Sequence, residues 1–122
     1  MSDDRAALVE VERSRASQQY LAYRETVINA AEEVGNGLVS YLRERRRRAA
    51  LQKSVAVYKQ AAALSGQLYE TGAGTFLDVL DAQRSLYAAE DALVQSEVAI
   101  AKAYIALCKA LGGGWAGVAK TG

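Results

Sequence analysis

Apolar residues recur at a seven-residue spacing along the C-terminal part of the chain. A row of large side chains starts at Val79, and a row of small ones starts three positions later, at Ala82. Rows with this spacing share one face of an α-helix that packs against another helix in a left-handed supercoil. We therefore predict a helix over residues 76–111. The seam rows are Val79, Leu86, Leu93, Ile100 and Leu107, and Ala82, Ala89, Ser96, Ala103 and Ala110.

A third apolar row widens this stripe. Its members each follow a residue of the large row, so they lie beside it on the helix surface. A stripe this wide exceeds what one partner helix covers, which indicates packing against more than one neighbour. The row comprises Leu80, Tyr87, Val94, Ala101 and Cys108.

The N-terminal part of the chain also reads as helix, and the whole sequence contains no proline. Its weakest point is the pair Gly35 and Gly37, since each glycine costs about 1 kcal/mol relative to alanine in a helix interior. The pattern predicts one long helix over residues 1–70 with a bend near 35–37. A three-helix alternative with a break there remains open.

Apolar positions in this first helix step by four and three in two separate frames. Because the frames do not join, we expect a discontinuous seam, with the helix bending or changing partners between them. The first frame is Val27, Ala31, Val34, Leu38 and Tyr41, and the second is Leu51, Val55, Tyr58, Ala62, Ser65 and Tyr69.

Turn signals separate the two helices. Gly72 and Gly74 can adopt positive φ, and Thr75 can cap the helix that follows. Asp78 stands three residues after Thr75, as in a capping box. Asp81 lies one turn further, so the two carboxylates share a face at a mutual electrostatic cost that capping does not explain.

These elements predict an all-α fold, a long antiparallel helical hairpin similar to a coiled coil, with its tip turn at residues 71–75. The returning helix should end at Leu111, where glycines favour a left-handed cap, which leaves residues 112–122 as a loose glycine-rich tail. A hairpin of 122 residues buries less surface than a globule, so a second copy or another partner is expected.

Composition excludes several classes of function. The 15 basic and 14 acidic residues give a net charge of +1, and the arginines of Arg43 to Arg48 spread around the helix, so a nucleic-acid partner is not expected. With no histidine and one cysteine, Cys108, no disulfide or Cys/His metal site can form within the chain, and no cofactor is expected. Paired carboxylates without a surrounding pocket argue against an enzyme.

The tip and the helix after it resemble a known family. Tyr69 to Gln83 follows the pattern Tyr-x-x-Gly-x-x-Thr-x-x-Asp-Val-Leu-Asp-Ala-Gln, the helix ends in "KALGGGW" at Trp115, and "YRETVINAAEEVGNGL" at Tyr23 to Leu38 fits more loosely. The chain is similar to the C-terminal periplasmic helical part of TolC-like outer membrane efflux proteins, the channels of tripartite efflux pumps and type I secretion.

The resemblance implies a trimer whose periplasmic tunnel of twelve helices includes this hairpin, and export of small molecules or proteins through a gated entrance. The implied partners are further copies, a periplasmic adaptor (membrane fusion) protein and an inner-membrane transporter. The implied location is the outer membrane and periplasm. Within the chain itself we expect no signal peptide, because it begins with acidic residues, and no barrel strand or membrane-spanning run.

The resemblance also assigns roles at the tip. Asp78 and Asp81 correspond to acids that face the lumen at the entrance, and Tyr69 to a tyrosine that helps to hold it shut. The basic partner of that tyrosine falls at Gly74 here, which departs from the family pattern. The tip-turn residues that an adaptor would contact are Gly72, Gly74 and Thr75.

The residues leave a second interpretation open, namely a stand-alone soluble coiled-coil hairpin. Such a hairpin would act as an oligomerisation or interaction module through the rows that start at Val79 and Ala82. Under this alternative the paired acids would have no role in conduction.

Overall fold

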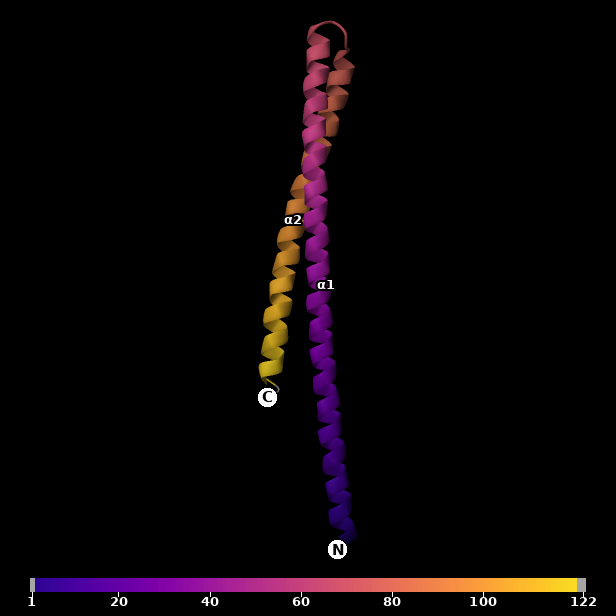
Figure 1. Cartoon of the computed structure of the whole chain (residues 1–122), viewed down its shortest axis with the longest axis vertical. Coiled ribbons are helices and arrows are strands. Elements are labelled where there is room, and N and C mark those ends of the chain that lie inside the picture. The colour runs from indigo at the N-terminus through magenta and orange to yellow at the C-terminus, as the bar shows by residue number, and fades with distance from the viewer. Residues whose placement is uncertain (1, 121–122) are drawn as a thin grey trace. The chain divides into compact units, whose positions relative to one another are not determined.

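The computed structural model describes the backbone of residues 2–120 and the side chains of residues 2–113. Two α-helices, α1 (Ser2–Glu70) and α2 (Phe76–Lys120), pack against each other as a hairpin (Figure 1). The predicted all-α hairpin is therefore confirmed. Internal contacts divide the chain into two units, Met1–Gly37 with Ala106–Gly122, and Leu38–Ile105.

The first helix is continuous over 69 residues, so the three-helix alternative is wrong. Gly35 and Gly37 lower helix propensity but keep their amide donors, and about 1 kcal/mol each is too little to interrupt a cooperative helix of this length. Asp3 and Asp4 lie in its first turn, where negative charge interacts favourably with the helix dipole.

The second helix continues to Lys120 and does not end at Leu111 as expected. A glycine terminates a helix when it adopts the left-handed conformation, and Gly112 and Gly113 do not adopt it. Among the described residues Gly72 is the glycine with positive φ. Of the tail expected to be loose, residues 121–122 lie outside the described part of the chain.

In the unit Leu38–Ile105, exposure along α2 follows the seven-residue rows. Ser96 is fully buried at 0% exposure, and Val55 of α1 is buried at 8%. The third row is different, since Tyr87 and Val94 are exposed. The other α2 seam positions of this unit are half-buried: Val79, Ala82, Leu86, Ala89, Leu93, Ile100 and Ala103.

The seam of α1 is continuous, which corrects the expectation of two separate frames. Glu44 and Arg48 are half-buried and join the stretches on either side, while Leu38, which was expected to face inward, is 45% exposed. An apolar search misses this frame because polar residues and a glycine occupy inward positions, where an arginine stem can cover apolar surface. The half-buried or buried frame is Ala30, Val34, Gly37, Tyr41, Glu44, Arg48, Leu51 and Val55.

Charged residues of the arginine run have local partners. The Arg47 guanidinium lies 3.6 Å from the Glu44 carboxylate, and Arg45 lies over the Tyr41 ring at 5.8 Å from its centroid. Arg47 is 51% exposed, so this ion pair contributes little to stability.

In the unit of Met1–Gly37 with Ala106–Gly122, the helices approach closely at Gly37. A Cβ atom at this position would lie 3.4 Å from Cδ1 of Leu107, which leaves no room for a larger side chain. Leu107 and Ala110 are half-buried here, as the seam rows require. Val27, which was expected in the α1 seam, is 39% exposed.

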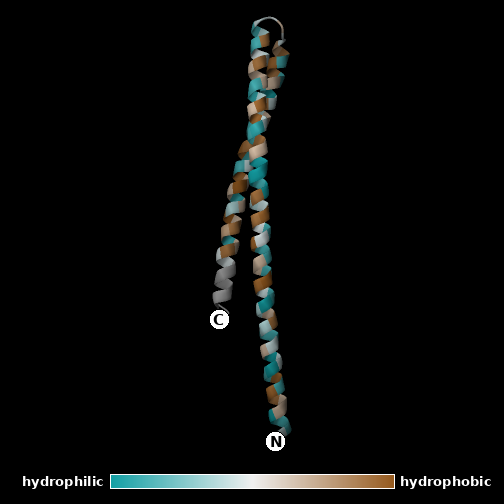
Figure 2. Ribbon diagram, viewed as in Figure 1, coloured by the Kyte–Doolittle hydropathy of each residue, from teal (hydrophilic) through white to brown (hydrophobic). Residues whose placement is uncertain are grey.

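The seam is narrow, and most large apolar side chains remain exposed. Figure 2 shows hydrophobic residues recurring along both helices, interleaved with hydrophilic ones. Among the residues searched, no helix is long and apolar enough to cross a membrane. The exposed apolar surface therefore points to neighbouring protein.

Substituting Ser96 tests the seam. Ser96→Leu should destabilise the chain by about 1–3 kcal/mol, because a larger side chain has no space at a fully buried position. Ser96→Ala should be neutral or stabilising, because the buried Ser96 hydroxyl has no hydrogen-bond partner. Urea unfolding followed by circular dichroism at one protein concentration measures both. Val94→Leu at an exposed position is the control, and equal loss for both leucine variants would contradict this packing.

Candidate functional site at the hairpin tip

The chain reverses direction in residues 71–75, directly after α1. The backbone N–H groups of Ala73 and Gly74 both donate to the carbonyl of Leu68, at 2.9 and 3.0 Å, and the Gly72 N–H donates to the Tyr69 carbonyl at 3.1 Å. The Thr71 hydroxyl also donates to the Leu68 carbonyl, at 3.0 Å. These bonds satisfy carbonyls that the last turn of a helix leaves without partners.

Two glycines make this turn sterically feasible for different reasons. Gly72 has φ of 79°, a conformation that side-chain-bearing residues adopt only at a cost. Gly74 packs against the end of α1, where an added Cβ would lie 3.1 Å from the Cβ of Leu68. The first glycine is needed for backbone conformation and the second for close approach.

The start of α2 is fixed by a reciprocal capping box. The Asp78 N–H donates to the Thr75 hydroxyl at 3.2 Å, and the Thr75 N–H donates to the Asp78 carboxylate at 3.2 Å. The carboxylate also lies in the first turn, where the helix dipole favours negative charge. Asp78 therefore has a structural role in holding the helix start.

Asp81 is in a different position. Its side chain is exposed and makes no hydrogen bond or ion pair within the described residues. Asp78 precedes Val79 by one residue and Asp81 precedes Ala82 by one, so both acids are rotated by about 100° from the seam. The structure thus brings the two carboxylates to one exposed flank of α2.

Tyr69 lies at the base of the turn against an aromatic partner. Its ring centroid is 5.6 Å from that of Phe76, with the planes inclined by 54°. Its hydroxyl makes no hydrogen bond in the part of the chain that the structure describes. Sequence reasoning missed Phe76, although a lone phenylalanine between the Thr75 cap and Asp78 was a usable signal.

The tip carries negative charge without neutralising bases. Between Lys59 and Arg84 the sequence holds three acids, Glu70, Asp78 and Asp81, and no lysine or arginine. Over the residues searched, no cluster of acids or cysteine is suited to hold a metal ion. The arrangement can attract cations through its field, but it offers no catalytic geometry.

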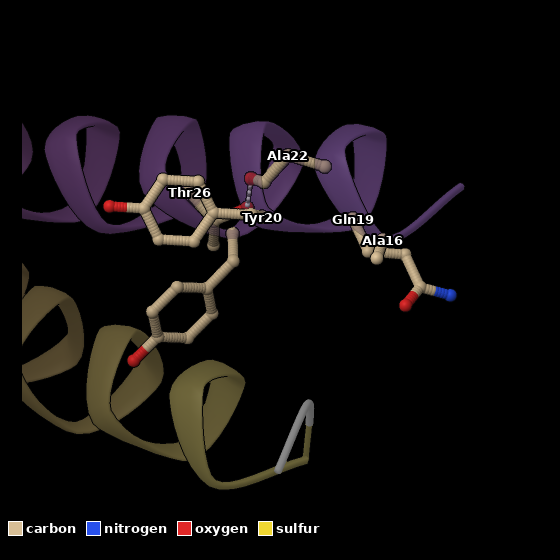
Figure 3. A pocket seen from close by; sticks show the side chains of 6 residues that line it. Ala16, Gln19, Tyr20, Ala22 and Thr26 are labelled. Carbon is tan, nitrogen blue, oxygen red and sulfur yellow. Dashed lines mark hydrogen bonds between the residues drawn. The ribbon is translucent and has the colours of Figure 1, made fainter. Parts of the chain in front are cut away.

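The other concave feature lies on α1. A shallow groove of about 600 Å³ runs along Ala16, Gln19, Tyr20, Ala22, Tyr23 and Thr26 (Figure 3). The Thr26 hydroxyl donates to the Ala22 carbonyl at 2.9 Å along one side of this groove. It contains no charged side chain, and its polar groups do not converge on a point as those of a ligand site do.

Comparison with known sequences places this geometry in a family. The profile described as "Outer membrane efflux protein" matches residues 2–113, nearly all of the chain. The chain belongs to the outer membrane efflux protein family, and the resemblance seen in the sequence is confirmed. Proteins of this family are channels and not enzymes, which confirms the expectation of a non-enzymatic role.

Several curated relatives share this segment. Nodulation protein T of Rhizobium leguminosarum bv. trifolii is 39% identical over 93% of this chain and 24% of its own length. The pyoverdine export outer membrane protein OpmQ of Pseudomonas aeruginosa is 40% identical over 87% of this chain and 23% of its own. The cation efflux system protein CusC of Escherichia coli O6:H1 is 32% identical over 89% of this chain and 24% of its own.

The chain spans about a quarter of the length of the relatives it matches. No solved structure matches it. The hairpin geometry described above is therefore the structural frame in which the family's features are placed.

Glycine substitutions test the turn. Gly72→Ala should destabilise the chain by about 1–2 kcal/mol, since the positive φ disfavours a side chain. Gly66→Ala is the matched control, because a Cβ there meets nothing within 4 Å and the helical position should gain up to about 1 kcal/mol. Thermal unfolding measured by circular dichroism compares the two, and a shift in the same direction for both would contradict the assigned roles.

Alanine substitutions separate the two acids. Asp78→Ala should lower stability by about 0.5–2 kcal/mol through loss of the capping box. Asp81→Ala should change stability by less than about 0.5 kcal/mol, because its exposed carboxylate contacts nothing. Urea unfolding of both variants measures this difference, and equal losses would mean that the cap at Asp78 is not a stabilising contact.

Proposed function

We propose that this chain forms part of the helical wall of an outer-membrane efflux channel, with its tip at the periplasmic entrance. The observation that carries the proposal is the family match over residues 2–113, which includes the whole tip. Members of this family serve in tripartite efflux pumps. By this proposal the chain works through passive conduction and gating, within a trimer located in the outer membrane and periplasm.

Asp78 and Asp81 are proposed to line the opening. Both lie on one exposed flank of α2, away from the seam, in a tip segment without basic residues. Repeated around a trimer, these carboxylates would form a ring that attracts cations, and their mutual repulsion would favour an open aperture. Of the two, Asp81 has its carboxylate free of contacts, so it is the stronger candidate for this electrostatic role.

Tyr69 is proposed to act in closing the entrance. Its ring rests on Phe76 and its hydroxyl is free of partners within the described residues, so it is able to bond to a neighbouring subunit. The turn around Gly72, Gly74 and Thr75 is compact, and we propose that it is the contact point for a periplasmic adaptor that links the channel to an inner-membrane transporter.

Cargo choice is proposed to lie outside this segment. Relatives named for pyoverdine export and for cation efflux are similar to the same stretch of this chain, at 40% and 32% identity. Similarity to proteins with such different names favours a general role in the conduit over recognition of one exported substance.

A chimeric channel tests the conduction role. Residues 2–113 would replace the matching segment of the Pseudomonas aeruginosa pyoverdine export protein, and reversal potentials in planar bilayers would give the cation-to-anion permeability ratio. Asp81→Asn should lower this ratio at least about twofold at low salt, with less effect at high salt. Glu97→Gln removes an exposed charge of α2 away from the tip and should leave the ratio unchanged. An Asp81→Asn channel with the parental ratio would refute the lumen-facing role.

A further inference from the structure

The outward surfaces of the unit Leu38–Ile105 carry two further stripes with heptad spacing. The α2 outer stripe is mostly apolar, with Leu77 65% and Tyr87 63% exposed, and the α1 outer stripe includes Val57 at 62% and Leu64 at 56%. The α2 outer stripe is Leu77, Leu80, Arg84, Tyr87, Asp91 and Val94, and the α1 outer stripe is Ala50, Lys53, Val57, Gln60, Leu64 and Gln67.

The two outer stripes face opposite sides of the hairpin. On α2, Leu80 follows the seam residue Val79 by one position, whereas on α1, Leu64 precedes the seam residue Ser65 by one. Each step turns about 100° around its helix. Because the helices are antiparallel, a forward step on α2 and a backward step on α1 lead to opposite sides. A neighbour placed beside the hairpin in the same orientation would therefore bring unlike stripes together.

The register of the hairpin sets which residues would meet. The ring contacts Tyr41 with Tyr104 and Tyr69 with Phe76 define the same level at both ends of this unit. By that register Lys53 is level with Asp91 to within one residue. In the same way Val57 is level with Tyr87 and Leu64 with Leu80, while Gln60 is level with Arg84.

Charge complementarity indicates the occupant. Lys53 and Asp91 are opposite in sign, both are exposed, and neither forms an ion pair within the described residues. The Asp91 carboxylate accepts one hydrogen bond, from the Gln95 side chain at 3.0 Å, and keeps other lone pairs free. Beyond Ala50 the α1 outer stripe gives way to Arg46 and Arg43, which limits the complementary surface to the tip half of the unit.

We infer that the α2 outer stripe binds the α1 outer stripe of a second copy of this chain, with the tips level and a Lys53 to Asp91 ion pair between copies. The apolar pairs Val57 with Tyr87 and Leu64 with Leu80 supply the buried surface, and the ion pair selects the register. Since each copy offers both stripes on opposite sides, the contact is head-to-tail and continues beyond a dimer.

This inference goes beyond the proposed function, because it names the partner of a surface that conduction alone does not specify. Self-association is measured on the 122-residue chain itself, and the conduction role on a longer chimeric channel. Each can therefore fail without the other.

Disulfide trapping tests the contact. In a Cys108→Ser background, which removes the exposed native thiol, Lys53→Cys combined with Asp91→Cys should give a ladder of dimers, trimers and larger species on mild oxidation. The control pair Lys59→Cys with Asp91→Cys should not, because Lys59 faces another direction on α1. Equal ladders for both pairs would overturn the inference. Dimers from Asp91→Cys alone would also overturn it, since they would mean that two α2 helices meet.

Charge reversal provides a second measurement. Asp91→Lys and Lys53→Asp should each weaken self-association in sedimentation equilibrium about fivefold or more, because like charges then face each other. The double variant should return to within about twofold of the parent. Circular dichroism checks that helix content is unchanged. Monomers at all concentrations of the parent chain, or a double variant no better than the single ones, would refute the inference.

Discussion

Close packing of small side chains along one narrow seam is the constraint on which the hairpin depends. Ser96 is fully buried, and Gly37 leaves only contact distance to Leu107. Close approach of the helix axes gives dispersion contacts, but a seam of small residues removes little apolar area from water. The large apolar side chains are consequently left on the outside, where they are available to neighbouring helices.

The regular part of the fold could be predicted from the sequence because its signals are local. The seven-residue rows of α2 indicate which positions turn inward, and in the structure the same positions have reduced exposure. The α1 frame was harder to predict because Gly37, Glu44 and Arg48 occupy inward positions that a search for apolar residues overlooks. The end of α2 was misjudged because glycine at 112 permits a left-handed cap without requiring one.

The candidate site divides in the same way. The capping box of Thr75 and Asp78 follows from a three-residue spacing, and the positive φ of Gly72 follows from the residue type. The packing of Phe76 on Tyr69 depends on the three-dimensional path of the turn, which no periodicity encodes. The level of Lys53 with Asp91 likewise needs the register between the helices. Short-range chemistry was therefore readable, and relations across the hairpin required coordinates.

The capping box at Asp78 has a consequence for how such a mouth can change over evolutionary time. Its carboxylate serves the helix start and the local charge together, so any replacement that alters one alters the other. Asp81 carries charge with no such mechanical duty. Natural variation in the electrostatics of the tip should therefore accumulate at position 81, while position 78 keeps a residue that is able to cap.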